Sequence, residues 1–239
     1  LYSMKTPLLS FLFFLVIFGA CISDRKPASA VDYSLLVNPF IGTDFTGNTY
    51  PGAQAPFGMV QLSPDNGLPG WDRISGYYYP DSTIAGFSHT HLSGTGAGDL
   101  YDISYMPVTL PYREAEAPLG IHSKFRHSDE EASAGYYRVL LKDYNINVEL
   151  TATERCGIQR YTFPKAQSAV FLNLKKAMNW DFTQDSHIEV VDSCTIQGYR
   201  FSDGWARGQR VFFRTRFSKP FRSSEIDTTA IIQDGKTIG

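Results

Sequence analysis

One continuous stretch, residues 135–163, constrains the fold more than any other part of the chain. It reads GYYRVLLKDYNINVELTATERCGIQRYTF, and apolar and polar residues alternate along most of its length. An alternation with a period of two indicates strands that bury one face and expose the other. The residues KDYN at 142–145 interrupt the alternation with turn formers, so we predict a hairpin there between two strands.

Strand-like alternation recurs along the rest of the chain. The further segments are FGMVQLSPD (57–65), DISYMPVTL (102–110), SAVFLNL (168–174), HIEVVDSCTIQGYRF (187–201) and QRVFFRTRFS (209–218). Turn-rich connectors such as FPKAQS and FSDGWARG separate them. No stretch keeps a helical period for more than about three turns. Evenly spaced strands joined by turns predict an all-β fold, an antiparallel β-sandwich, over residues 32–239.

Composition narrows the class of protein. The chain has 239 residues, of which 43% are hydrophobic and 14% aromatic, enough to bury a sizeable core. Its formal net charge is −2, so there is no electrostatic argument for a nucleic-acid partner.

The N-terminus has the pattern of a targeting segment. A basic start at Met4-Lys5 is followed by the apolar run PLLSFLFFLVIFGAC, which ends at Cys21. That length suits a signal peptide over residues 1–21 rather than a membrane-spanning helix. Small residues before a cysteine are typical of bacterial lipoproteins. We therefore expect a lipid on Cys21, a flexible tether over 22–31, and a periplasmic, outer-membrane or cell-surface location. The alternative is ordinary secretion with Cys21 discarded.

Two further cysteines, Cys156 and Cys194, lie in strand-like surroundings. They could pair in an oxidising compartment, or remain two buried thiols. The sequence leaves both possibilities open.

The segment GFSHTHLSGTGAGDL, residues 86–100, places two histidines two positions apart. On a strand, His89 and His91 would project from one face and could share a zinc ion. Zinc would need a third ligand, for which spacing singles out no residue. The candidates for that ligand are His122, His127, His187 and Asp99. The alternative is a pair of structural histidines that bond to the backbone.

Trp71 lies in a turn-rich segment, residues 66–89, close to Tyr77, Tyr78 and Tyr79. An indole on a loop can stack on the apolar face of a sugar, or it can cover the edge of a sandwich. Glycoside hydrolysis usually needs two carboxylates across the scissile bond. Spacing singles out no pair among the acids of this region, which are Asp44, Asp65, Asp72, Asp81, Asp99 and Asp102.

Three ordered blocks carry a family resemblance. They are VNPFIGTDFTGNTYPGAQAPFGMVQLSPD, GWDRISGYYYPDSTIAGFSHTHLSGTGAGDLYDISYMP and GWARGQRVFFRTRFSKPF. From about Leu36 to its end the chain resembles glycoside hydrolase family 92, the calcium-dependent exo-α-mannosidases. Members of that family join an N-terminal β-sandwich to a C-terminal (α/α)6 barrel. The chain matches the sandwich alone, so we expect it to be a fragment truncated before the barrel.

The resemblance implies that the sandwich and the barrel have different roles in the reaction. Hydrolysis of terminal α-mannosides in glycans would proceed with inversion. The catalytic carboxylates and most calcium ligands would lie on the barrel, and a loop of the sandwich would reach the substrate. Trp71 of the GWD motif would line the pocket. Asp72, His89, His91 and Asp99 match family motifs as pocket or interface residues.

Two positions depart from the family pattern. Asn48 stands where a histidine is expected, and Ala97 where a cysteine is usual. Neither removes an acid, but Asn48 could alter a contact in the pocket.

Three hypotheses follow. The first is the N-terminal domain of an inverting exo-α-mannosidase, inactive without its barrel. The second is a stand-alone carbohydrate-binding sandwich without catalysis. The third is a zinc enzyme built on His89 and His91.

Overall fold

The computed structural model describes residues 31–113, 115, 120–175, 180–226 and 229–233. Residues from Ser34 onward make one compact unit, and the contacts described below lie within it. The expected signal peptide, Cys21 and nearly all of the expected tether lie outside the described residues. Among the helices in the described part of the chain, none is long and apolar enough to cross a membrane.

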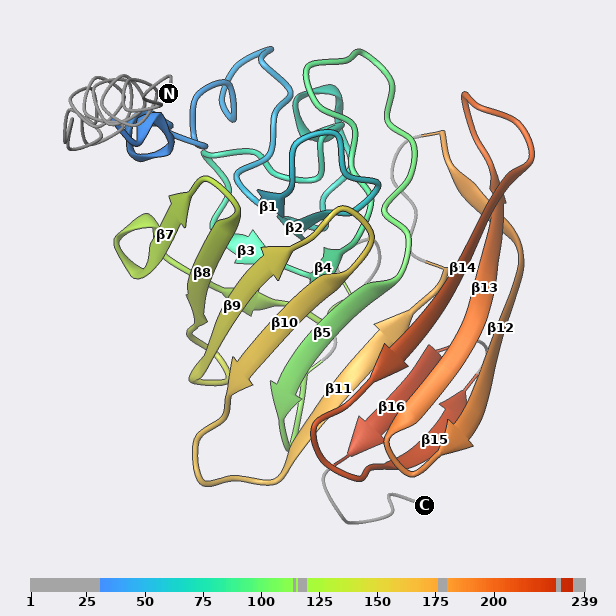
Figure 1. The fold of residues 1–239 in the computed structure, drawn as a ribbon. Helices are drawn as coiled ribbons and strands as arrows, with labels where there is room; N and C mark the ends of the chain where they lie inside the picture. Colours follow the sequence, from blue (N-terminus) through green and yellow to red (C-terminus); the bar gives the residue numbers. More distant parts are fainter. Residues whose placement is uncertain (1–30, 114, 116–119, 176–179, 227–228, 234–239) are drawn as a thin grey trace, which may run out of the picture. The chain divides into compact units, whose positions relative to one another are not determined.

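The described residues form short strands and a few 3-10 turns (Figure 1). The strands are β1 (Ala53–Gln54), β2 (Gln61–Asp65), β3 (Thr83–Ile84), β4 (Gly86–Ser88), β5 (Ser104–Thr109), β6 (Ser123–Lys124), β7 (Glu130–Ser133), β8 (Tyr136–Leu141), β9 (Ile146–Ala152), β10 (Gly157–Thr162), β11 (Ser168–Asn173), β12 (Phe182–Asp192), β13 (Thr195–Asp203), β14 (Gln209–Arg216), β15 (Arg222–Ile226) and β16 (Thr229–Gln233). The 3-10 turns are η1 (Tyr33–Leu36), η2 (Trp71–Arg73) and η3 (His127–Asp129).

The strands are arranged in layered antiparallel sheets. A seven-stranded sheet has the order β1-β2-β4-β5-β11-β16-β15, a four-stranded sheet has the order β10-β9-β8-β7, and a three-stranded sheet has the order β12-β13-β14. Strands β3 and β6 form a small fourth sheet. The prediction of an all-β antiparallel sandwich is confirmed.

The hairpin predicted at residues 142–145 is also confirmed. Strands β8 and β9 pair across it, with Leu141 opposite Ile146. Asn145 closes the turn in a left-handed conformation with φ of 52°, which asparagine tolerates better than most residues. The next hairpin joins β9 to β10, with Ala152 opposite Gly157.

The seven-stranded sheet is buried on both faces where β5 and β11 cross its centre, and each strand is buried over five consecutive residues. Successive side chains alternate between faces. Met106 of β5 packs toward the four-stranded sheet, against residues such as Val148. Tyr105, its neighbour, joins the cluster that holds Ile196 of the three-stranded sheet. The sandwich therefore has two cores, one on each face of the central sheet.

The two later cysteines lie in separate hairpin turns. Cys156 is exposed in the β9–β10 turn, and Cys194 is partly exposed in the β12–β13 turn. Both thiols are free. The structure shows neither alternative, a Cys156–Cys194 pair or two buried thiols, because each cysteine falls at its own turn rather than inside the flanking strand.

Candidate functional site

Four loop segments far apart in the sequence meet on one side of the described unit. They are η2, the glycine-rich stretch 94–100 before β5, the Trp180–Asp181 turn before β12, and the β13–β14 connection at 204–208. Direct contacts link them. The Asp99 carboxylate reaches the β13–β14 connection, and the ring of Trp71 reaches both Gly96 and Trp180. This convergence places most of the residues singled out from the sequence near one another.

Trp71 begins η2 and is 56% exposed. Its ring contacts Trp180 and lies close to Gly96, while more than half of the residue remains accessible. Its neighbour Asp72 is half-buried in the same turn. Arg73, the next residue, anchors the turn through a two-pronged pair with Asp81, with Nε–Oδ2 and Nη2–Oδ1 distances of 2.6 and 2.5 Å. The Arg73–Asp81 pair thus anchors the turn, and the Trp71 indole remains exposed.

His89 is packed among apolar groups and the backbone. Its Nδ1 lies 2.7 Å from the carbonyl oxygen of Ile103, and its ring meets that of Tyr105 edge-on at 5.8 Å. A Cβ added to Gly157 would lie 2.7 Å from His89 Cδ2, so the two segments are in close contact. Burial lowers the pKa of His89 to about 4, because the charged form would lose its hydration. At neutral pH this ring is uncharged.

His91 is buried, and both of its ring nitrogens have partners. Nδ1 lies 2.7 Å from the carbonyl oxygen of Gln61, and Nε2 lies 2.9 Å from Asp65 Oδ1 and 3.0 Å from Ser88 Oγ. The ring also packs against Tyr50, with the centroids 5.1 Å apart. His91 therefore ties the segment after β4 to strand β2.

The structure does not favour a zinc site on this pair. His89 and His91 follow β4 rather than lying on it, and they contact different groups. Within the described ranges, no three side chains of His, Cys, Asp or Glu form a group that could hold a metal ion. Within the same residues, the carboxylates that a calcium ion would favour are likewise not gathered in threes.

Asp99 is 2% exposed and binds the β13–β14 connection. Its Oδ1 accepts the backbone N–H of Trp205 at 2.8 Å, and its Oδ2 accepts that of Ala206 at 2.7 Å. A Cβ at residue 204 would lie 2.3 Å from Asp99 Oδ1, so only Gly204 fits there. The carboxylate holds a loop in place, and its oxygens face the protein's own N–H groups.

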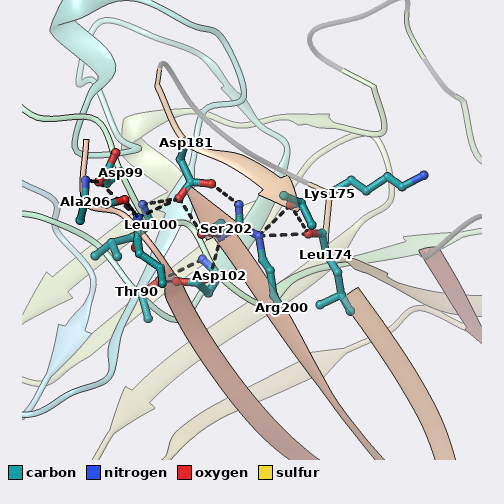
Figure 2. A network of polar contacts seen from close by, with 12 residues as sticks. Thr90, Asp99, Leu100, Asp102, Leu174, Lys175, Asp181, Arg200, Ser202 and Ala206 are labelled. Atoms are coloured by element: carbon teal, nitrogen blue, oxygen red, sulfur yellow. Dashed lines mark hydrogen bonds and ion pairs between the residues drawn. The ribbon is translucent and has the colours of Figure 1, made fainter. Parts of the chain in front are cut away.

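Arg200 lies on β13 with its side chain fully buried (Figure 2). Its Nη1 donates to Asp102 Oδ1 at 2.6 Å, and its Nη2 donates to Asp181 Oδ1. Ser202 donates to Asp181 Oδ2 at 3.1 Å. Gln209 Nε2 lies between Asp181 and Asp99, 3.5 and 3.3 Å from their Oδ2 atoms. We call Arg200, Asp102, Asp181, Ser202 and Asp99 the Arg200 network.

The network is strongly dehydrated. Burial raises the pKa of Asp181 above its usual range, although the hydrogen bond from Arg200 opposes that shift. Thr90 Oγ1 donates to the second oxygen of Asp102 at 2.6 Å. Buried charges need such partners, since an unpaired ion in a protein interior is costly. The carboxylates of Asp99, Asp102 and Asp181 thus bind groups of the chain itself.

Sequence reasoning did not single out Arg200, Asp181 or Trp180. A signal for Arg200 did exist. In the alternating segment 195–203 it occupies an inward position, where a cation has to find buried carboxylates. Asp181 and Trp180 precede a strand and carry no comparable pattern.

All three tryptophans of the chain lie on this side and are exposed. Trp71 and Trp180 meet edge-to-face, with ring centroids 6.1 Å apart and an interplanar angle of 77°. Trp180 is 47% exposed and Trp205 is 76% exposed. A Cβ at Gly96 would lie 3.3 Å from Cη2 of Trp71. The site thus has exposed indole rings on loops that adjoin the buried Arg200 network.

Asn48 and Ala97, the two residues that depart from the family pattern, both lie at the glycine-rich stretch 94–100. Asn48 is buried, and its carbonyl accepts the N–H of Gly94 at 2.6 Å. Ala97 belongs to the stretch itself and donates its N–H to Thr95 Oγ1 at 2.8 Å. Both substitutions therefore lie close to the segment that touches Trp71.

Known proteins resemble the chain over most of its length. Residues 36–238 match the glycosyl hydrolase family 92 N-terminal domain. A family 92 α-mannosidase from Bacteroides thetaiotaomicron, solved in complex with mannoimidazole, is 34% identical over 84% of this chain and 30% of its own, with a TM-score of 0.77. The family 92 glycosyl hydrolase ccman5 is 26% identical over 85% of this chain and 30% of its own, with a TM-score of 0.69.

A curated relative, an uncharacterized secreted glycosidase of Arthroderma benhamiae, is 26% identical over 160 residues, which is 63% of this chain and 20% of the relative. The chain thus spans less than a third of the length of these relatives. The match over residues 36–238 nevertheless includes the loops that carry Trp71, the glycine-rich stretch and the β13–β14 connection. The chain therefore belongs to glycoside hydrolase family 92, as its N-terminal domain.

Proposed function

We propose that the chain is the N-terminal domain of an inverting exo-α-mannosidase that removes terminal α-mannosyl residues from glycans. Family membership and the similarity to an α-mannosidase structure that contains mannoimidazole support this proposal. The observation that carries it is Trp71, which a family motif places on a loop and which the structure leaves 56% exposed beside Gly96. An indole in that position can stack on the apolar face of a mannose ring.

The chemistry would reside outside the described residues. A single displacement needs an acid to protonate the leaving oxygen and a base to activate water. The carboxylates beneath the candidate site, Asp99, Asp102 and Asp181, are bound by groups of the chain itself. We therefore assign the acid, the base and the calcium site to a C-terminal (α/α)6 domain. That domain would pack on the sandwich.

The location of the protein belongs to the same proposal. The apolar run that ends at Cys21 supports export across the inner membrane, with a lipid on Cys21 anchoring the protein to the outer membrane or cell surface. The curated relative described as secreted is consistent with export.

Kinetics of the complete protein encoded by the gene would test the role of Trp71. We expect Trp71→Ala to lower kcat/KM for α-mannosides at least tenfold, while the circular dichroism spectrum and the unfolding midpoint stay unchanged. Trp71→Phe should retain part of the activity, because a smaller ring can still stack. An unchanged kcat/KM in Trp71→Ala would refute the pocket role.

A stand-alone carbohydrate-binding module is the second candidate. The exposure of all three tryptophans favours it, since stacking on sugars needs no catalytic carboxylate. The two candidates differ in what the 239-residue chain does alone. The binding module would be favoured if the chain binds saccharides without releasing mannose and if its gene encodes no barrel. Calcium-dependent mannose release by this chain alone would contradict both.

A further inference from the structure

Trp180 is the second exposed indole of the Trp71 surface. It was not among the residues picked out from the sequence, and it lies more than a hundred positions from Trp71. The two rings nevertheless touch, with centroids 6.1 Å apart. Trp71 remains 56% exposed and Trp180 remains 47% exposed, so the contact leaves roughly half of each residue free. The exposed half of each indole is accessible to a ligand or to the proposed C-terminal domain, and the test below separates the two.

The angle between the rings sets what the pair can bind. The indole planes are 77° apart. A pyranose stacks with its ring roughly parallel to an aromatic plane, so one sugar cannot stack on both indoles at once. Two consecutive sugars joined by a glycosidic bond can each lie on a different ring. The pair therefore suits a disaccharide rather than a single monosaccharide.

The loops that carry the two rings are both connected to the Arg200 network. Asp181 directly follows Trp180, and Arg200 and Ser202 bind its carboxylate. The backbone N–H of Leu100 reaches Asp181 Oδ2 at 3.3 Å, which ties the glycine-rich stretch to the same carboxylate. That stretch contacts Trp71 through Gly96. The loops that carry the two indoles are thus linked to each other through buried hydrogen bonds, and an ordered loop lowers the entropy lost on binding.

We propose that Trp180 binds the second sugar of an α-mannoside, on the leaving-group side, while Trp71 binds the terminal mannose. This assignment rests on the proposed function and adds to it a residue that recognises the glycan beyond the cleaved bond. Trp180 then contributes to the choice among glycosidic linkages, because each linkage directs the second ring differently. It adds nothing to the binding of a ligand that has only one ring.

The test compares two ligands in the complete protein encoded by the gene. Calorimetry would measure Kd for mannoimidazole, which has one sugar-like ring, and for the tightest-bound of a set of α-mannobioses whose linking oxygen is replaced by sulfur, which resist hydrolysis. We expect Trp180→Ala to raise Kd for the mannobiose about tenfold, as the loss of one stacked ring implies. Kd for mannoimidazole should change less than twofold. Trp71→Ala should weaken both ligands.

Two control variants separate binding from structure. Trp180→Phe should restore most of the affinity for the mannobiose, because an aromatic face remains. Phe212→Ala removes another exposed ring, 69% exposed on β14, and should alter neither Kd.

Three outcomes would overturn the assignment. Trp180→Ala could leave both Kd values unchanged, or raise both equally. It could also lower the unfolding midpoint without changing either Kd, which would make the ring a contact between domains. If Trp71→Ala also has no effect, or the unsubstituted protein binds neither ligand, the proposed function falls as well. A normal Trp71→Ala effect with none at Trp180 overturns the present inference alone.

Discussion

The apolar core and the Arg200 network are built on opposite principles. Between the seven-stranded and four-stranded sheets lies an apolar core with fully buried side chains such as Phe87, Val139 and Leu150. In the Arg200 network, the fully buried Arg200 binds two carboxylates. Apolar burial stabilises without fixing direction. Charged hydrogen bonds fix direction but need every partner in place. The structure uses the first to hold the sheets together and the second to position the tryptophan loops.

The largest effect should come from removing the cation. Arg200→Met would leave the carboxylates of Asp102 and Asp181 buried without their charged partner, which costs about 3–5 kcal/mol of unfolding free energy. Urea unfolding followed by circular dichroism measures the loss. The emission of the three tryptophans should also shift in the native state, because Trp180 adjoins Asp181.

A double variant and a surface variant serve as controls for Arg200→Met. Adding Asp181→Asn should recover part of the loss, since one uncompensated charge disappears. Arg160→Met removes an exposed cation that pairs with Glu149 and should leave the unfolding midpoint unchanged. If Arg200→Met behaved like Arg160→Met, the contrast between the apolar core and the Arg200 network would be wrong.

Truncating a side chain in the apolar core should lower the unfolding free energy without changing the tryptophan emission. Leu150→Ala opens a cavity at a residue that is 1% exposed and should cost about 3 kcal/mol. The tryptophan emission of the folded protein should stay as in the unsubstituted chain, because Leu150 belongs to the apolar core and not to the Arg200 network. Comparing urea midpoints with native emission spectra separates the two effects. A shifted spectrum in Leu150→Ala would show that the loops depend on the apolar core as much as on the network.

His89 should make stability depend on pH. Its folded pKa of about 4 lies below the ordinary value of 6.5, so the unfolded chain binds a proton more readily in the window between them. Stability should therefore fall as pH drops through that window, by about 2 kcal/mol between pH 8 and pH 5. Asp181 acts in the opposite sense in acid, because its pKa is raised.

His89→Asn tests this pH effect. Its amide can still donate to the carbonyl oxygen of Ile103 but cannot titrate. Urea midpoints for this variant should lose most of the decline between pH 8 and pH 5. An equally steep decline in His89→Asn would assign the acid sensitivity to other groups.

Much of the fold could be predicted, and the reason is local. Along 135–163, both the alternation and the turn at 142–145 are consequences of neighbouring residues, and both are confirmed. The assignment of Trp71 to an exposed loop followed from similarly short-range signals. The partners of His89 and His91 could not be predicted. They come from β2 and the segment before β5, so spacing left both a metal pair and structural anchors open.

The sequence by itself determined the strand pattern, the hairpins and membership of family 92, because periodicity and motif order are properties of neighbouring residues. Only the tertiary structure decided that Asp99 binds the β13–β14 connection, that Arg200 joins Asp102 to Asp181, and that Trp180 meets Trp71. Those partners lie between about 20 and 110 positions apart. They meet because antiparallel sheets stack and bring distant loops to one side, which a one-dimensional pattern does not encode.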